Sequence, residues 1–255
     1  MLKITKEQME VFEQAAIRNF EDRILEHLNE HFPKQHSMLG EFAARNVIRQ
    51  GFERAKSYGL TTERNVSLYI NLMFMLGSGF DTDLQLPWAA EVLTDETILD
   101  ETERIDRLSD RATQYLDYVA GGNNEHIDAA LLKMRQERIE ALPESDAGNF
   151  ENHMVKLLNK IFPQKCEYMG KNCVRQLIQR GIESATNHGI TIQRGFVIYI
   201  GMMFMLGSGF ATDPQFPWVA EILKDKDIED QNKRVDRLYE GAMAYLERWL
   251  TGPGE

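Results

Sequence analysis

Apolar residues recur at intervals of three and four along most of the chain, a spacing that predicts amphipathic helices. In the first half it predicts helices over about 5–31, 39–58, 62–76, 87–93 and 96–119. Thr5 and Gln8 have the spacing of a capping box, and Pro87 suits the first position of a short helix. Phe32-Pro33 and Gly59 are expected to interrupt or end helices. No convincing run alternates apolar and polar residues, so we expect an all-α fold.

The chain repeats itself at an offset of 130 residues. The stretch MFMLGSGFDTDLQLPWAAEVL (73–93) recurs as MFMLGSGFATDPQFPWVAEIL (203–223), and about 49 aligned residues are identical, roughly 40%. We therefore expect a tandem duplication of a bundle of roughly five helices, with a pseudo-two-fold relation between copies. The expected division is a repeat over 1–122, a joint over 123–130 and a second repeat over 131–255. The two repeats are expected to join near the turn-forming Gly121-Gly122-Asn123-Asn124, and Pro143 and Gly148 are expected to interrupt the first helix of the second copy.

Composition and charge narrow the function classes. The 255 residues are 43% hydrophobic and 27% charged, with a net charge of −11 that disfavours nucleic-acid binding. Residues 1–125 hold 22 acidic and 13 basic residues, so most of this charge lies in the first half. Such a surface either aids solubility or attracts a basic partner. Two cysteines and a first segment without an apolar stretch predict a cytoplasmic protein without a signal peptide.

The apolar stretches VSLYINLMFMLGSGF and FVIYIGMMFMLGSGF are about 15 residues long, whereas a membrane span needs roughly 20. We expect each to form a helix buried in its own half rather than a membrane-active hairpin. Their methionines, among them Met73, Met75, Met202, Met203 and Met205, either pack in the core or offer an adaptable surface for apolar segments.

One motif suggests a metal. His27-x-x-Glu30-His31 has the spacing of an inverted zinc-protease motif, in which two histidines bind zinc and the glutamate acts as base. His36, or Cys166 in the equivalent position, could add a ligand. The second copy has Leu157, Lys160 and Ile161 at the motif positions, which favours packing over metal binding. A zinc-dependent hydrolase therefore remains only an alternative.

Other candidate chemistry is weaker still. The Gly-Ser-Gly sequences at 77–79 and 207–209 follow a helix instead of a strand and lack a lysine, so a phosphate loop is not expected. Asp81 and Asp83 begin like a calcium loop but lack its later ligands, and Asp83 and Asp213 are better suited to capping backbone amides. Cys166 and Cys173 have no counterparts in the first copy. We therefore expect no catalytic residues, no metal and no cofactor.

Polar and aromatic residues kept in both copies have two interpretations. As a structural set they would cap helices and form ion pairs that tie helices together. The pairs are Glu21/Glu151, Arg45/Arg175, Glu53/Glu183, Arg64/Arg194, Arg104/Arg234 and Asp106/Asp236, together with Arg107/Arg237. As a duplicated partner-binding surface, the expected residues are Phe80, Asp83, Trp88, Glu91, Phe210, Asp213, Trp218 and Glu221.

The phrase LGSGFDTDLQLPWAAEVL, with LYINLMFM before it and RIDRL after it, resembles a family of helical bacterial proteins encoded near type VI secretion effectors. The resemblance is centred on 66–108 and 196–238 and implies no catalytic residues. It implies an adaptor or chaperone for a secreted effector, or an immunity protein that neutralises a toxin by binding it. In either case we expect a protein partner, no stable membrane insertion and a monomer that resembles a dimer.

Overall fold

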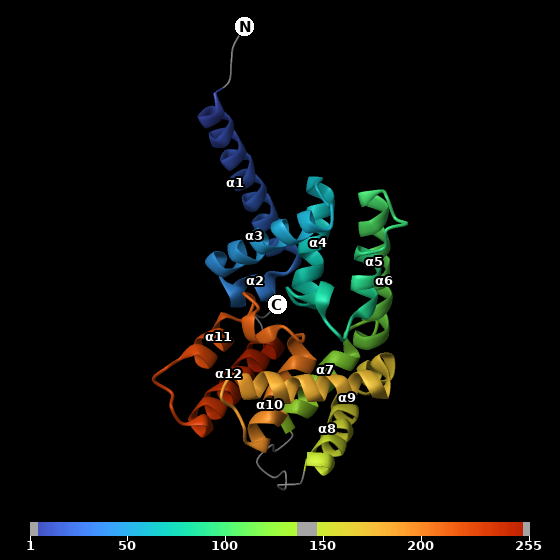
Figure 1. Ribbon diagram of the computed structural model, residues 1–255, viewed down its shortest axis with the longest axis vertical. Helices are drawn as coiled ribbons and strands as arrows, with labels where there is room; N and C mark the ends of the chain where they lie inside the picture. Colours follow the sequence, from blue (N-terminus) through green and yellow to red (C-terminus); the bar gives the residue numbers. More distant parts are fainter. Residues whose placement is uncertain (1–4, 137–146, 252–255) are drawn as a thin grey trace.

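The computed structural model describes residues 5–136 and 147–251, and over these residues the chain forms 12 α-helices, two short 3-10 helices and no strand (Figure 1). The all-α prediction is therefore confirmed. The first half contains α1 (Lys6–His31), α2 (Pro33–Leu39), α3 (Glu41–Ser57), α4 (Glu63–Leu76), η1 (Phe80–Thr82), α5 (Pro87–Leu93) and α6 (Glu101–Ala120). The second contains α7 (Glu125–Gln136), α8 (Ala147–Ile161), α9 (Pro163–Asn187), α10 (Gln193–Leu206), η3 (Phe210–Thr212), α11 (Pro217–Lys224) and α12 (Gln231–Thr251).

Each half encloses its own hydrophobic core. One core runs from Phe20 to Tyr115 and the other from Phe150 to Ala242, and neither includes a residue of the opposite half. In Figure 1, α1–α6 occupy the upper part of the view and α7–α12 the lower part. The apolar helices α4 and α10 are buried in their own halves, as expected. No described helix is long and apolar enough to cross a membrane.

Local signals in the sequence explain most helix ends. The capping box of Thr5 and Gln8 is present at the start of α1, and Gly59 has a positive φ just after α3. Gly121 and Asn124 also have positive φ in the turn before α7. Phe32-Pro33 does not simply break the chain, because Pro33 begins the additional short helix α2.

Two expectations about the helices were wrong. The last helix of the first half begins at Glu101 instead of Glu96, because Asp95 accepts bonds from Thr97 in a turn and Asp100 caps the helix. Gly148 lies inside α8 and does not interrupt it. The segment 123–130, expected to be a joint, is mostly helical because α7 begins at Glu125. Pro143 lies outside the described residues.

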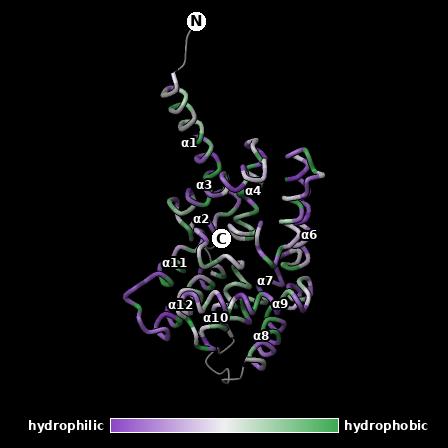
Figure 2. The backbone as a smooth tube through the Cα atoms, in the orientation of Figure 1, coloured by the Kyte–Doolittle hydropathy of each residue, from purple (hydrophilic) through white to green (hydrophobic). Residues whose placement is uncertain are grey.

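The first turns of α1 project beyond the other helices (Figure 1). They carry apolar as well as polar positions (Figure 2), and Val11 and Phe12 are each 63% exposed. Farther along, Phe20, Ile24 and Leu28 enter the core of the first half. Among the α1 side chains that the structure describes, those that enter the core lie in the later part of the helix.

Candidate functional site

The two repeated loops contact each other across the middle of the molecule. The backbone amide of Ser78 donates to Asp213 at 2.8 Å, and that of Ser208 donates to Asp83 at 2.7 Å. The side-chain amide nitrogen of Gln85 donates to the Met203 carbonyl at 2.9 Å, and the side-chain amide nitrogen of Gln215 donates to the Met73 carbonyl at 2.8 Å. Each half thus supplies the hydrogen-bond partners of the other's loop. We call this contact the loop–loop interface.

Glycine is needed where the two backbones approach. Gly77 and Gly207 have φ values of +97° and +98°, which favour glycine. A Cβ atom on Gly77 would lie 3.1 Å from the Leu206 carbonyl oxygen, and one on Gly207 would lie 3.2 Å from an Asp83 carboxylate oxygen. The Gly-Ser-Gly sequence therefore serves close packing, in agreement with the structural interpretation.

The interface carboxylates are buried but well supplied with donors. Asp83 and Asp213 are 5% and 6% exposed. Besides its cross-half bond, each accepts the backbone amide of the glutamine two residues later. Burial raises the pKa of Asp213, while its bonds from Ser78 and Gln215 oppose the shift. The predicted capping role of both aspartates is confirmed.

The residues expected to bind a partner do not form one exposed surface. Phe80, Asp83, Trp88, Phe210 and Asp213 are buried within the chain. Glu91 and Glu221 are exposed, and Trp218 is half-buried. A partner in contact with the folded chain would therefore reach only Glu91, Trp218 and Glu221 of this set.

The two tryptophans have different surroundings although their local sequences match. Trp88 is 3% exposed, and on its side Tyr168 of α9 packs against Tyr115 and Tyr118 of α6 with ring centroids 5.0 and 5.9 Å apart. The position equivalent to Tyr168 in the first half is Met38. Near Trp218, where Met38 takes the place of this tyrosine, the structure has a groove instead of a packed ring.

This groove has a volume of about 380 Å³ and lies between α2 and the helices α11 and α12. Trp218, Tyr245 and Met38 line it, and Glu221 and Arg248 lie among its polar residues. Gly241 is needed beneath the tryptophan, because a Cβ atom there would lie 2.5 Å from the Trp218 ring. We call this feature the Trp218 groove.

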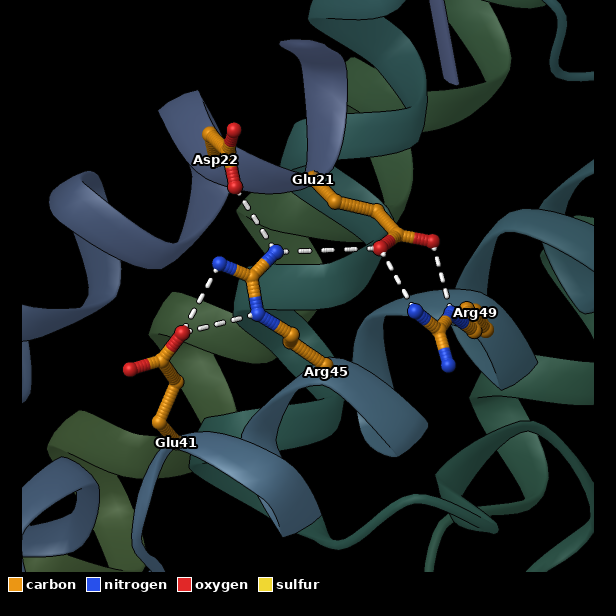
Figure 3. Close-up of polar contacts among 5 residues, drawn as sticks. All are labelled: Glu21, Asp22, Glu41, Arg45 and Arg49. Carbon is orange, nitrogen blue, oxygen red and sulfur yellow. Dashed lines mark hydrogen bonds and ion pairs between the residues drawn. The ribbon is translucent and has the colours of Figure 1, made fainter. Parts of the chain in front are cut away.

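Most other polar residues shared by the halves tie helices together. Figure 3 shows Glu21, which is only 4% exposed, accepting two bonds from Arg49 at 2.7 and 3.0 Å. Arg45 bonds to Asp22 and Glu41 and lies 3.8 Å from Glu21 (Figure 3). The second half has a reduced version in which Arg175 pairs with Glu151.

The last helix of each half is fixed by one arginine. Arg104 donates to the carbonyl oxygens of Tyr58, Leu93 and Ile98, and Arg234 donates to those of His188, Asp225 and Ile228. Arg64 also pairs with Asp106, and Arg194 with Asp236. These contacts agree with the structural interpretation of the residues that the two copies share.

One buried ion pair exists only in the first half. Arg54 bonds through two nitrogens to Asp81, which is 1% exposed and also accepts the Tyr69 hydroxyl at 2.7 Å. The equivalent residues are Ser184, Ala211 and Tyr199, and there the serine and tyrosine hydroxyls lie 2.8 Å apart. The same space thus holds a charged pair in one half and a neutral hydrogen bond in the other. Asp81 is committed to Arg54, which disfavours the calcium interpretation.

A second space lies between the halves, beside the loop–loop interface. This cavity of about 210 Å³ includes Lys165 and Gln85 in its lining. The Lys165 ammonium donates to the Phe204 carbonyl at 2.5 Å and lies 5.0 Å from the Phe204 ring centroid. Burial lowers the pKa of Lys165 to about 8, although the Asp83 charge opposes this shift. We call this feature the Lys165 cavity.

The zinc candidate has its histidines engaged by neighbours. The rings of His27 and His31 stack at 4.1 Å, and His27 Nε2 lies 3.1 Å from the Asn71 amide nitrogen. Within the part of the chain that the structure describes, no three His, Cys, Asp or Glu side chains are grouped so that they could hold a metal ion. Cys166 is buried, which raises its pKa to about 12 and disfavours a reactive thiolate.

Sequence reasoning missed Lys165 and the paired glutamines. Gln85 and Gln215 could have been found, since both copies keep a glutamine two residues after the aspartate. Lys165 carried no signal of this kind, because its counterpart is Gln35. The Trp218 groove could not be predicted from the segments around the two tryptophans, because these segments are nearly identical. The groove depends instead on the distant residues Met38 and Tyr168, which differ.

Comparisons with protein-family models, with curated proteins and with solved structures gave no match for this chain.

Proposed function

We propose that this protein is a non-enzymatic protein-binding module, acting as an adaptor or chaperone for a bacterial secreted effector. In this proposal the chain is a tandem duplication, and its two helical repeats pair about a pseudo-two-fold axis through the loop–loop interface. The reciprocal bonds of Asp83 and Asp213 support that arrangement. The pairing leaves two sites related by the repeat, of which one is filled and the other is open.

The observation that carries the proposal is the difference between these two sites. On the filled side Tyr168 packs against Tyr115 and Tyr118. On the open side Met38 leaves the Trp218 groove of about 380 Å³. An apolar cavity of about 150 Å³ is large enough for benzene, so this groove has room for an aromatic side chain. We infer that the partner inserts an aromatic side chain there, in the place that Tyr168 takes on the other side.

The chemistry of the groove suits a protein ligand. A half-buried tryptophan beside an arginine and other aromatic residues is typical of the anchor points of protein interfaces. Glu221 and Arg248 can bond to polar groups on either side of the inserted ring. Buried Met73, Met202 and Met203 do not offer the adaptable surface considered above, whereas Met75 is 44% exposed. The groove is therefore the preferred binding surface.

The test is affinity capture of the tagged protein from its native host, followed by mass spectrometry. One partner should co-purify in equimolar amount with the wild type and be lost with Trp218→Gln. Leu99→Gln is the matched control, because Leu99 is 92% exposed and lies in the loop between α5 and α6. Capture that is equal for wild type and Trp218→Gln would overturn the assignment of the groove.

An immunity role stays an alternative, because it also requires a protein partner. Co-expression separates the two roles. An adaptor should leave the toxicity of the captured effector intact and increase its export, whereas an immunity protein should abolish the toxicity.

A further inference from the structure

The Lys165 cavity adjoins the Trp218 groove, with which it shares Gln35, Gln215, Phe216 and Tyr245, but only the cavity contains a lysine. Its walls are largely apolar and combine aliphatic side chains with the rings of Phe74, Tyr115, Phe162, Phe204, Phe216 and Tyr245. The polar part of its lining includes the Asp83 carboxylate as well as Lys165 and Gln85. Residues from both halves therefore enclose it. At about 210 Å³ it exceeds the volume of a cavity that takes up benzene, about 150 Å³.

Lys165 places an incompletely satisfied cation in this space. An ammonium group has three donors. Lys165 forms one hydrogen bond, to the Phe204 carbonyl, and no ion pair within 4.0 Å among the residues that the structure describes. The Asp83 charge favours the protonated amine but does not offset the loss of water around it. A bound anion would supply the missing compensation.

A second polar group in the lining also lacks a partner. Gln85 is 1% exposed, and its amide nitrogen bonds to Met203 and Asp83. Its amide oxygen is buried and accepts no hydrogen bond. Leaving such an acceptor unsatisfied costs about 1–3 kcal/mol, so a donor from a ligand or a water molecule would stabilise the site.

We propose that the Lys165 cavity is a binding site for a small aromatic carboxylate. The carboxylate bonds to the free donors of Lys165, and the ring packs among the aromatic walls. A hydroxyl or amino substituent on the ring can donate to the amide oxygen of Gln85. Because both halves form the walls, the bound acid also stabilises the contact between the halves.

The test is a titration of the full-length protein at neutral pH with benzoate and phenylacetate, each compared with its neutral amide. We expect both acids to bind at least tenfold more tightly than their amides, since only the acids pair with the ammonium. Lys165→Met should weaken binding of the acids by tenfold or more. Lys171→Met, an exposed lysine just beyond the kink at Gly170 in α9, should leave binding unchanged.

The location is checked without relying on that variant. Met205 lines the Lys165 cavity, whereas Met9 lies on the projecting turns of α1. In a sample with labelled methionine methyl groups, benzoate should shift the Met205 signal and leave the Met9 signal in place. The proposal is overturned by absence of binding up to about 10 mM, by equal binding of acids and amides, or by a methyl shift confined to other sites.

Discussion

The buried pair of Arg54 and Asp81 gives the sharpest stability prediction, because the second half contains its natural replacement. Asp81→Ala leaves the Arg54 guanidinium and the Tyr69 hydroxyl without their acceptor. Removing one partner of a buried ion pair typically costs about 3–5 kcal/mol, and Asp81→Ala should lie at the lower end because the Arg54 side chain is 29% exposed and can be rehydrated. Arg54→Ser should cost a similar amount, since it leaves a carboxylate that is 1% exposed without its cation.

The double variant Arg54→Ser/Asp81→Ala should behave differently. It recreates the Ser184, Ala211 and Tyr199 part of the second half, in which two hydroxyls satisfy each other at 2.8 Å, while Tyr58 stays in place of His188. We expect its free energy of unfolding to lie within about 2 kcal/mol of the wild type, because a buried ion pair replaced as a unit often costs little. The two single effects sum to about 6–10 kcal/mol, so the coupling energy should exceed about 4 kcal/mol.

The assay is urea unfolding of the full chain, followed by far-ultraviolet circular dichroism for all four proteins. Where a single variant is too unstable to purify, recovery of folded protein on adding the second substitution gives the same information. Additive destabilisation in the double variant would refute the reasoning. It would mean that the first half depends on the ion pair in a way that the second half does not.

Three further predictions concern the loop–loop interface, the Lys165 cavity and the Trp218 groove. Asp83→Ala should speed hydrogen exchange of the Ser208 amide in the opposite half by about tenfold or more, as measured by NMR, because that amide loses its acceptor; unchanged exchange would contradict the cross-half bond. Burial lowers the pKa of Lys165 from 10.5 to about 8, so between these values the unfolded chain binds more protons there than the folded chain. Unfolding experiments should therefore show the wild type gaining stability relative to Lys165→Met as pH rises across that interval, by up to about 3 kcal/mol, and a gain on acidification would reverse the sign we derive. Gly241→Ala should displace the Trp218 ring and cost about 1–3 kcal/mol, with a shift in tryptophan fluorescence, whereas a spectrum and melting temperature equal to those of wild type would show that the contact is loose.

The sequence was sufficient for the helices but not for their arrangement. Periodic apolar positions and capping residues predicted the all-α fold and the end of α1 at His31. The start of α6 was missed, because Asp100 caps the helix through a local bond that the apolar spacing does not reveal. The short helix α2 was also missed, because Pro33 was expected to interrupt the chain and instead begins a helix.

The site was harder to predict for a different physical reason. Sequence identity between the halves drew attention to Asp83 and Asp213. It could not show whether these residues bind a partner or join the two halves. Both roles demand the same residues in both copies. The groove arises from a difference, Met38 against Tyr168, and differences between copies are also the commonest product of neutral drift.

The most direct test of the proposed function is to fill the Trp218 groove with a larger side chain of the protein itself. Met38→Tyr places in the first half the residue that occupies the equivalent position in the second. Tyr168→Met, the reciprocal change, serves as the matched control on the filled side. With the partner captured from the native host, calorimetry of the three purified proteins should show binding to wild type and Tyr168→Met, and at least tenfold weaker binding to Met38→Tyr. Equal affinity for wild type and Met38→Tyr would contradict the claim that the Trp218 groove receives an aromatic side chain of a protein partner.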